Sequence, residues 1–211
     1  MLKKISAVAL FIIALTFISS KNYQYKDLSY KDKNSGLRVL QYETILSYLN
    51  DGDIIFRLGD RVWSDYFKEL SLNEKRYSHV GIVRKQNYNV TVIHAEGHAF
   101  EGKDQVNEVS LNDFLEHARS IGIYRLRTIE GESISNTALE YMGCPFDWQF
   151  DMDDDSKLYC SELLYVILRK LDKDTEIKKI WVKEMGKYII PLDMYTQTEY
   201  FEEIYSIDFS T

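Results

Sequence analysis

The chain of 211 residues has little of what marks a repetitive, linker-rich or disulfide-built protein. It contains two prolines and two cysteines, and it shows no internal repeat and no low-complexity segment. Its formal net charge is −7, whereas binding to nucleic acid requires a basic surface. No basic amphipathic stretch indicates binding to a membrane surface either. These absences favour one globular domain and exclude a nucleic-acid partner.

The N-terminal segment is the one long hydrophobic run. Lys3 and Lys4 precede the uncharged residues 5–18, and two serines follow at positions 19 and 20. This arrangement is typical of a secretory signal peptide and is short for a membrane span. We expect residues 1–20 to be removed and residues 21–211 to form a single exported domain, periplasmic or extracellular, with no integral membrane segment. The alternative is an uncleaved signal anchor; no cysteine follows the run, so a lipoprotein is not indicated.

The two cysteines, Cys144 and Cys160, could form a disulfide in an exported protein. Cys160, however, lies near the start of a predicted helix, residues 156–171, at one end of its apolar stripe. That stripe comprises Cys160, Leu163, Leu164, Ile167, Leu168 and Leu171. We expect the acidic residues 153–155 and Ser156 to cap this helix. A helix N-terminus favours a thiolate, and the amides of Cys160 and Ser161 could bind an oxyanion. A plain buried cysteine is the alternative.

The four histidines all lie between positions 79 and 117. Two valine- and isoleucine-rich runs, 79–84 and 90–95, are predicted strands of a hairpin. A two-residue turn at positions 86 and 87 would place His79 directly opposite His94. A turn shifted by one residue toward the C-terminus would place His79 opposite Glu96. Either register gives a base with an orienting partner.

Metal binding is the competing interpretation of the same residues. His79, His94, Glu96 and His98 are possible zinc ligands, with Cys160 as another. Their spacing matches none of the compact zinc signatures. The aspartates between positions 147 and 155 lack the glycine and terminal glutamate of a calcium-binding EF-hand loop. We therefore expect no metal and no cofactor.

Other elements follow from hydrophobic periodicity and from turn residues. Apolar spacing predicts helices at 37–49, 63–70, 111–118, 134–142 and 178–185. Short strands are predicted at 53–57 and 121–126. The segment from residue 188 onward has no clear assignment.

Several segments, in this order along the chain, resemble a known family. They are residues 51–57 (DGDIIFR), 77–83 (YSHVGIV), 92–97 (VIHAEG), 143–148 (GCPFDW), 159–163 (YCSEL) and 189–193 (IIPLD). Together they are similar to the permuted papain-like amidases and peptidases of the YiiX type, circularly permuted relatives of NlpC-like cell-wall peptidases. The resemblance implies an α+β fold in which a small, mostly antiparallel sheet packs against helices.

The resemblance also implies roles for particular residues. Cys160 matches the family's nucleophile and His79 its general base. His94 stands where the family often has a glutamate, with Glu96 as the alternative third residue. The implied activity is hydrolysis of an amide or ester bond in a small-molecule, peptide or lipid-type acyl substrate, with the cell envelope as the expected source. The alternatives are a non-catalytic binding module of the same fold and a zinc-binding protein.

Overall fold

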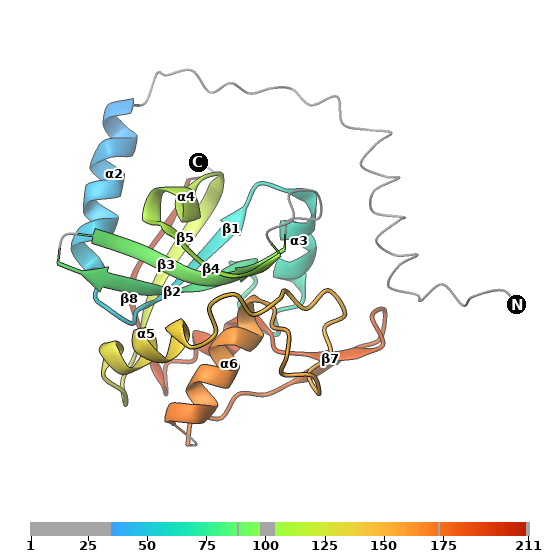
Figure 1. Ribbon diagram of the computed structural model, residues 1–211. Helices are drawn as coiled ribbons and strands as arrows, with labels where there is room; N and C mark the ends of the chain where they lie inside the picture. Colours follow the sequence, from blue (N-terminus) through green and yellow to red (C-terminus); the bar gives the residue numbers. More distant parts are fainter. Residues whose placement is uncertain (1–34, 88, 98–103, 173, 210–211) are drawn as a thin grey trace, which may run out of the picture.

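The computed structural model describes residues 35–87, 89–97, 104–172 and 174–209. The expected signal peptide and His98 lie outside these ranges. A six-stranded antiparallel sheet forms the centre, in the order β4-β3-β2-β1-β5-β8 (Figure 1). Its strands are β1 (Ile54–Gly59), β2 (His79–Gln86), β3 (Asn89–Glu96), β4 (Gln105–Ser110), β5 (Ala118–Leu126) and β8 (Phe201–Asp208). The expectation of an α+β fold with a mostly antiparallel sheet is confirmed.

Helices cover both faces of the sheet (Figure 1). One face carries α5 (Gly131–Leu139), α6 (Cys160–Leu171) and the 3-10 helix η1 (Leu192–Tyr195). The opposite face carries α2 (Ser35–Tyr48) and α4 (Leu111–Leu115), while α3 (Val62–Glu69) follows β1. No helix within the described ranges has the length and hydrophobicity of a membrane span.

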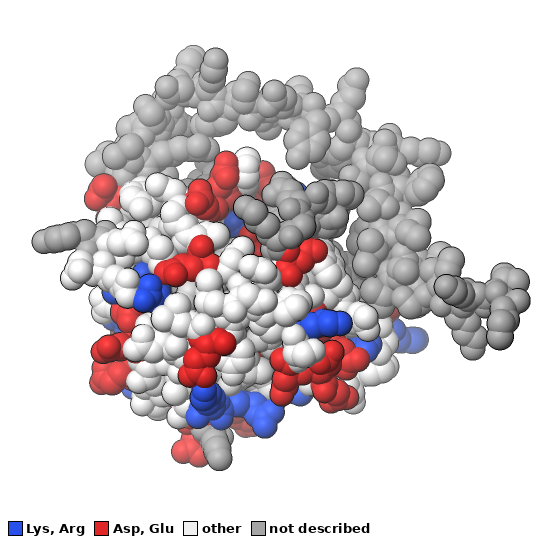
Figure 2. Space-filling view, in the orientation of Figure 1, with Lys and Arg blue, Asp and Glu red and all other residues white. Residues whose placement is uncertain are grey.

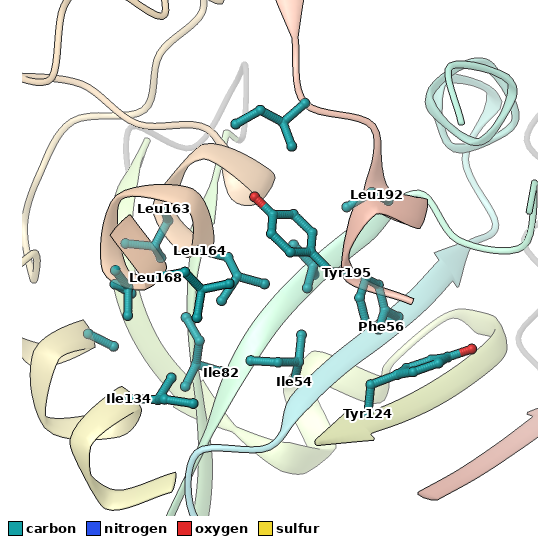
Figure 3. Packing of buried hydrophobic residues seen from close by; sticks show 14 of the residues in the cluster. Ile54, Phe56, Ile82, Tyr124, Ile134, Leu163, Leu164, Leu168, Leu192 and Tyr195 are labelled. Atoms are coloured by element: carbon teal, nitrogen blue, oxygen red, sulfur yellow. The ribbon is translucent and has the colours of Figure 1, made fainter. Parts of the chain in front are cut away.

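Alternation along the strands produces two hydrophobic cores. Ile54 and Ile82 face α6, whereas Ile55 and Val83 face α2 and α4. Figure 3 shows the first core, in which leucines of α6 lie over the isoleucines of the central strands. Each fully buried leucine or isoleucine contributes about 1.5–3 kcal/mol relative to an exposed one. The apolar stripe predicted for the cysteine helix is therefore confirmed as the surface that fixes α6 to the sheet.

Three sequence-based assignments are wrong. Strand β4 was not predicted, because its alternating polar residues carry a weak apolar signal. The predicted helix 178–185 is a hairpin of β6 (Ile180–Val182) and β7 (Lys187–Ile189), in which Gly186 has a φ of +62°. Helix α6 begins at Cys160 and not at residue 156. For β4 and the start of α6, contacts with distant segments override the local pattern. For residues 180–189, the turn at Gly186 favours a hairpin over a helix.

Charges of both signs are interspersed on the face seen in Figure 2, with several groups of Asp and Glu. That distribution agrees with the net negative charge of the chain.

Candidate active site

Two histidines from neighbouring strands meet at one end of the sheet. His79 is the first residue of β2 and His94 lies near the end of β3. His79 Nε2 and His94 Nδ1 are 2.8 Å apart, a hydrogen-bond distance. His94 is almost completely buried, so its ring is held by packing as well as by this bond.

The hairpin register is the shifted one, and not the register that we placed first. Gln86 pairs with Asn89 and Ile82 with Ile93, so continuing the ladder would set His79 opposite Glu96 and not His94. The turn begins at Asn87, whose φ of +54° suits asparagine better than most other residues. The two imidazoles nevertheless meet, because His79 reaches diagonally across the pair of strands, a distance that long side chains can span.

Glu96 extends this arrangement to a partly buried cation, Arg57. Its carboxylate forms an ion pair with the guanidinium of Arg57, and its second oxygen lies 3.6 Å from His94 Nδ1. Arg57 also donates from Nη1 to the carbonyl of Phe114 at 2.8 Å, and its guanidinium lies over the ring of Phe114. That ring packs against both imidazoles, with centroid distances of 5.8 Å to His79 and 5.4 Å to His94. Arg57 and Phe114 thus hold Glu96 and the two histidines in place.

Cys160 is the first residue of α6, and its thiol is close to the same strand end. The backbone amides of Val80, the residue after His79, of Ser161 and of Cys160 itself are near enough to the sulfur to favour its thiolate form. Burial raises the pKa of the thiol to about 11; the three amides act in the opposite direction, and the charge of Glu96 raises the pKa further. Burial therefore opposes the thiolate that a helix N-terminus alone would favour.

The start of α6 is held by contacts different from those expected. The aspartates before the helix, with Ser156, form turns within their own loop, because Asp147 accepts from the amides of residues 149 and 151, and Asp154 accepts from that of Ser156. The N-cap is Tyr159, whose amide donates to Glu162 Oε2 at 3.4 Å. The predicted capping by the acidic loop is therefore wrong.

The segment after β7 locks this end of the helix. The hydroxyl of Ser161 donates to the carbonyl of Ile190 at 2.8 Å, and the Ile190 amide donates to the hydroxyl of Tyr159 at 3.0 Å. The hydroxyl of Tyr195 donates to the carbonyl of Ser161 at 2.6 Å, with its ring beside α6 in Figure 3. These three bonds fix the residues on either side of Cys160.

Both cysteines are free thiols, so the disulfide considered from the sequence is not formed. Burial raises the pKa of Cys144, and the negative charges of Glu162 and Asp154 raise it further. The pKa of both thiols is thus raised, so electrostatic surroundings do not distinguish Cys144 from Cys160 as a nucleophile.

A metal ion is the other ligand that these side chains might hold. Within the described ranges, ligand atoms of His79, His94 and Glu96 lie within 4.8 Å of one another, and Cys160 is not part of that group. Two nitrogens on a tetrahedral zinc, each about 2.0–2.1 Å from the ion, would be roughly 3.3 Å apart. The observed 2.8 Å is shorter, and Glu96 already binds Arg57. This arrangement fits a hydrogen-bonded triad and would have to open to take zinc.

The fold and the paired histidines beside a helix-bound cysteine define a papain-like class of protein. Residues 48–210 match the family described as permuted papain-like amidase enzymes, YaeF/YiiX, C92 family. The chain belongs to this family of amidases, as its sequence segments indicated.

Two relatives can be compared directly. Over 124 residues the chain is 29% identical to the protein YiiX of Escherichia coli strain K12. The matched segment covers 55% of this chain and 55% of YiiX, so the chain spans about half the length of that relative. The crystal structure described as metalloprotein yiiX from Escherichia coli O157:H7 has a TM-score of 0.61 and 17% identity. It covers 75% of this chain and 97% of its own, which shows a shared fold.

Sequence reasoning missed Arg57, Phe114 and Glu162. For Arg57 a signal existed: it ends an otherwise apolar strand run, where an arginine needs a partner. Phe114 and Glu162 gave no such signal, because aromatic residues in helices and glutamates in a first helical turn are ordinary.

Proposed function

We propose that this chain is a cysteine amidase in which Cys160 is the nucleophile, His79 the general base and His94 the residue that orients His79. The observation that carries the proposal is the 2.8 Å bond between His79 Nε2 and His94 Nδ1. This bond lies at the start of β2, where the amide of the next residue, Val80, is near enough to the Cys160 sulfur to lower its pKa. Because Nε2 of His79 is bound to His94, we assign the other ring nitrogen, Nδ1, to proton exchange with the thiol.

The chemistry follows from a thiol that is protonated at rest. His79 takes the thiol proton as the sulfur attacks the carbonyl carbon of the substrate, and the amides of Cys160 and Ser161 stabilise the oxyanion. His79 then gives the proton to the leaving amine as the carbon–nitrogen bond breaks. Water, deprotonated by His79, attacks the resulting thioester, which releases the acid and regenerates the thiol.

Glu96 has a supporting role in this proposal. Its ion pair with Arg57 keeps a negative charge near His94, which favours the positive charge that develops on the imidazoles during the reaction. The substrates that we propose are exported N-acyl or peptide amides, and esters would react by the same steps. Export by residues 1–20 is part of the proposal; N-terminal sequencing of the mature protein tests it.

The experiment compares Cys160→Ala, His79→Ala and the double variant on a panel of N-acyl amides and peptides. We expect each single variant to lose nearly all turnover while its circular dichroism and melting temperature stay close to those of the wild type. The double variant should be little worse than either single one, because the two groups act as one unit. Full turnover in Cys160→Ala would refute the proposal. Cys144→Ala is the matched control and should keep full activity.

A metal site is the second candidate function. Two observations favour it: the convergence of His79, His94 and Glu96, and the description of the E. coli O157:H7 relative as a metalloprotein. Elemental analysis of the purified protein and zinc titration by calorimetry test it. Stoichiometric zinc that is lost in His94→Ala and retained in Cys160→Ala would support the metal site. Absence of zinc binding with intact amidase activity would support the cysteine mechanism.

A further inference from the structure

The loop between α5 and α6 crosses the end of the sheet beside the catalytic candidates. Its first part is bound to β4, because the Val106 amide donates to the carbonyl of Cys144 at 2.8 Å. Its last part runs beside its first, where the Leu158 amide donates to the Pro145 carbonyl at 3.0 Å. The loop is thus fixed at both ends, immediately before Cys160.

Trp148, in the middle of this loop, packs against the residue that follows Glu96. That residue is Gly97, and a Cβ built there would lie 2.6 Å from Trp148 Cζ2 and 2.8 Å from Phe146 Cδ1. Only glycine permits so close a contact. The indole also donates from Nε1 to Asp104 Oδ2 at 2.9 Å and packs edge-on against Phe146, with centroids 4.9 Å apart. Trp148 is therefore held at the end of β3, yet 36% of it remains exposed.

A hollow of about 340 Å³ opens beside this indole. Its walls include Asp104, Asp147 and Lys157 as well as the two aromatic rings. Both carboxylates accept protein N–H groups, Asp104 from Trp148 and Asp147 from the amides of residues 149 and 151. The charge of Lys157, three residues before Cys160, adds to the hydrogen bonds from Ser156 in lowering the pKa of Asp154. The hollow therefore combines an apolar wall with one ammonium group and two carboxylates that already accept protein N–H groups.

We propose that this hollow is a substrate subsite for N-acyl amino acids, in which the apolar part lies against Trp148 and the carboxylate is bound by Lys157. This inference rests on the amidase function proposed above and names its substrate class. Aromatic side chains supply most of the contact area in small-molecule sites, and a few placed polar groups fix orientation. A charge-assisted bond from the ammonium group would select a carboxylate over its neutral carboxamide. The subsite adjoins the proposed catalytic residues along the chain, because Trp148 packs on Gly97, which follows Glu96, and Lys157 precedes Cys160 by three residues.

The test measures binding first, in the full-length Cys160→Ala protein, by calorimetry with N-octanoyl-alanine and its carboxamide. We expect the carboxylate to bind at least tenfold more tightly than the carboxamide. Adding Trp148→Ala should weaken binding of both at least tenfold, whereas Trp148→Phe, which keeps a ring, should recover most of the affinity. Adding Lys157→Gln should remove the preference for the carboxylate. Trp181→Ala, an exposed tryptophan on the β6–β7 hairpin, is the control and should change nothing.

Three outcomes would overturn the subsite: no measurable binding, equal loss in Trp148→Ala and Trp181→Ala, or equal affinity for carboxylate and carboxamide in protein that retains Lys157. Tighter binding of N-octanoyl-glucosamine, which has no carboxylate, would likewise refute it in favour of a sugar ligand.

Hydrolysis of N-octanoyl-alanine is measured separately, with protein that retains Cys160. The expected binding pattern without hydrolysis would refute the amidase function and leave the subsite standing. With hydrolysis, Trp148→Ala should raise KM at least tenfold and leave kcat within about threefold.

Discussion

At the scale of single residues, the site is a chain of four polar side chains in which each fixes the next. Arg57 pairs with Glu96, Glu96 lies 3.6 Å from His94, and His94 bonds to His79. The sequence left His94 and Glu96 as alternative partners of His79. The structure puts His94 in direct contact and Glu96 one step further away, so the two should contribute unequally.

This inequality gives the first prediction. His94→Ala should lower kcat by about 10²-fold, because it removes the group that holds the base in its productive orientation. Glu96→Gln should lower kcat less, since His94 still bonds to His79. Steady-state kinetics of the two variants, with Glu108→Gln as a control on the neighbouring strand, decides the matter. A larger loss in Glu96→Gln than in His94→Ala would contradict the assignment.

The second residue-scale prediction concerns the pH dependence of thiol alkylation. Because burial raises the pKa of Cys160 to about 11, the reactive thiolate is scarce at neutral pH. The rate of iodoacetamide labelling, measured by mass spectrometry in Cys144→Ala protein, should rise about tenfold per pH unit between roughly pH 7 and pH 10. A rate that is already constant below pH 8 would instead indicate a preformed pair of thiolate and imidazolium.

At the scale of elements, α6 connects the site to the core. Its leucines bury against β2, and its first turn carries Cys160 and the fully buried Glu162. Burial raises the pKa of Glu162 to about 8, and the charges of Asp147 and Asp155 add to this, whereas the Tyr159 amide bond opposes it. A carboxyl group with such a pKa links the stability of this helix to pH.

The third prediction follows from the sign of that shift. The folded pKa of Glu162 exceeds the value near 4.3 of an unfolded glutamate, so the folded state binds the proton more tightly. Its contribution to stability is complete below pH 4 and is lost as pH rises toward 8. Glu162→Gln should remove this loss, so that its melting temperature relative to wild type increases between pH 5 and pH 8. Glu132→Gln, an exposed glutamate in α5, should show no such trend; a parallel course for both variants would contradict the assignment.

At the scale of the whole molecule, the two faces of one sheet contribute to two hydrophobic cores, and each core supports a different part of the site. The core under α6 positions Cys160, whereas the core under α2 and α4 supports the histidines through Phe114. Ile45 lies at the α2 side of the second core, and none of the proposed catalytic residues belongs to that core.

The fourth prediction separates these tasks. Leu164→Ala and Ile45→Ala should each lower the free energy of unfolding by about 2–5 kcal/mol, since both side chains are fully buried. Only Leu164→Ala should also lower kcat of the folded protein, because it loosens the helix that carries Cys160, the proposed nucleophile. Urea unfolding and kinetics normalised to the folded fraction measure both effects. Equal kcat values in the two variants would show that packing under α6 does not control the site.

The sequence by itself determined the elements whose residues repeat with one clear period. The apolar stripe of α6 and the two strands predicted at 79–84 and 90–95 followed from local spacing, and the α+β class followed from the family segments. Cys160 and His79 could be chosen as candidates from the sequence, because their residue types and their positions at the ends of predicted elements can be read from it directly.

The tertiary structure decided what depends on partners distant in the chain. The hairpin register was set by a turn that starts at Asn87, one residue beyond our first placement, and β4 exists because it pairs with β3. The partnership of Arg57 with Glu96 joins residues that are 39 positions apart. The state of the Cys160 thiol likewise depends on burial and on the Val80 amide. Such contacts leave no periodic trace in the sequence, because their energies arise only when distant segments are packed together.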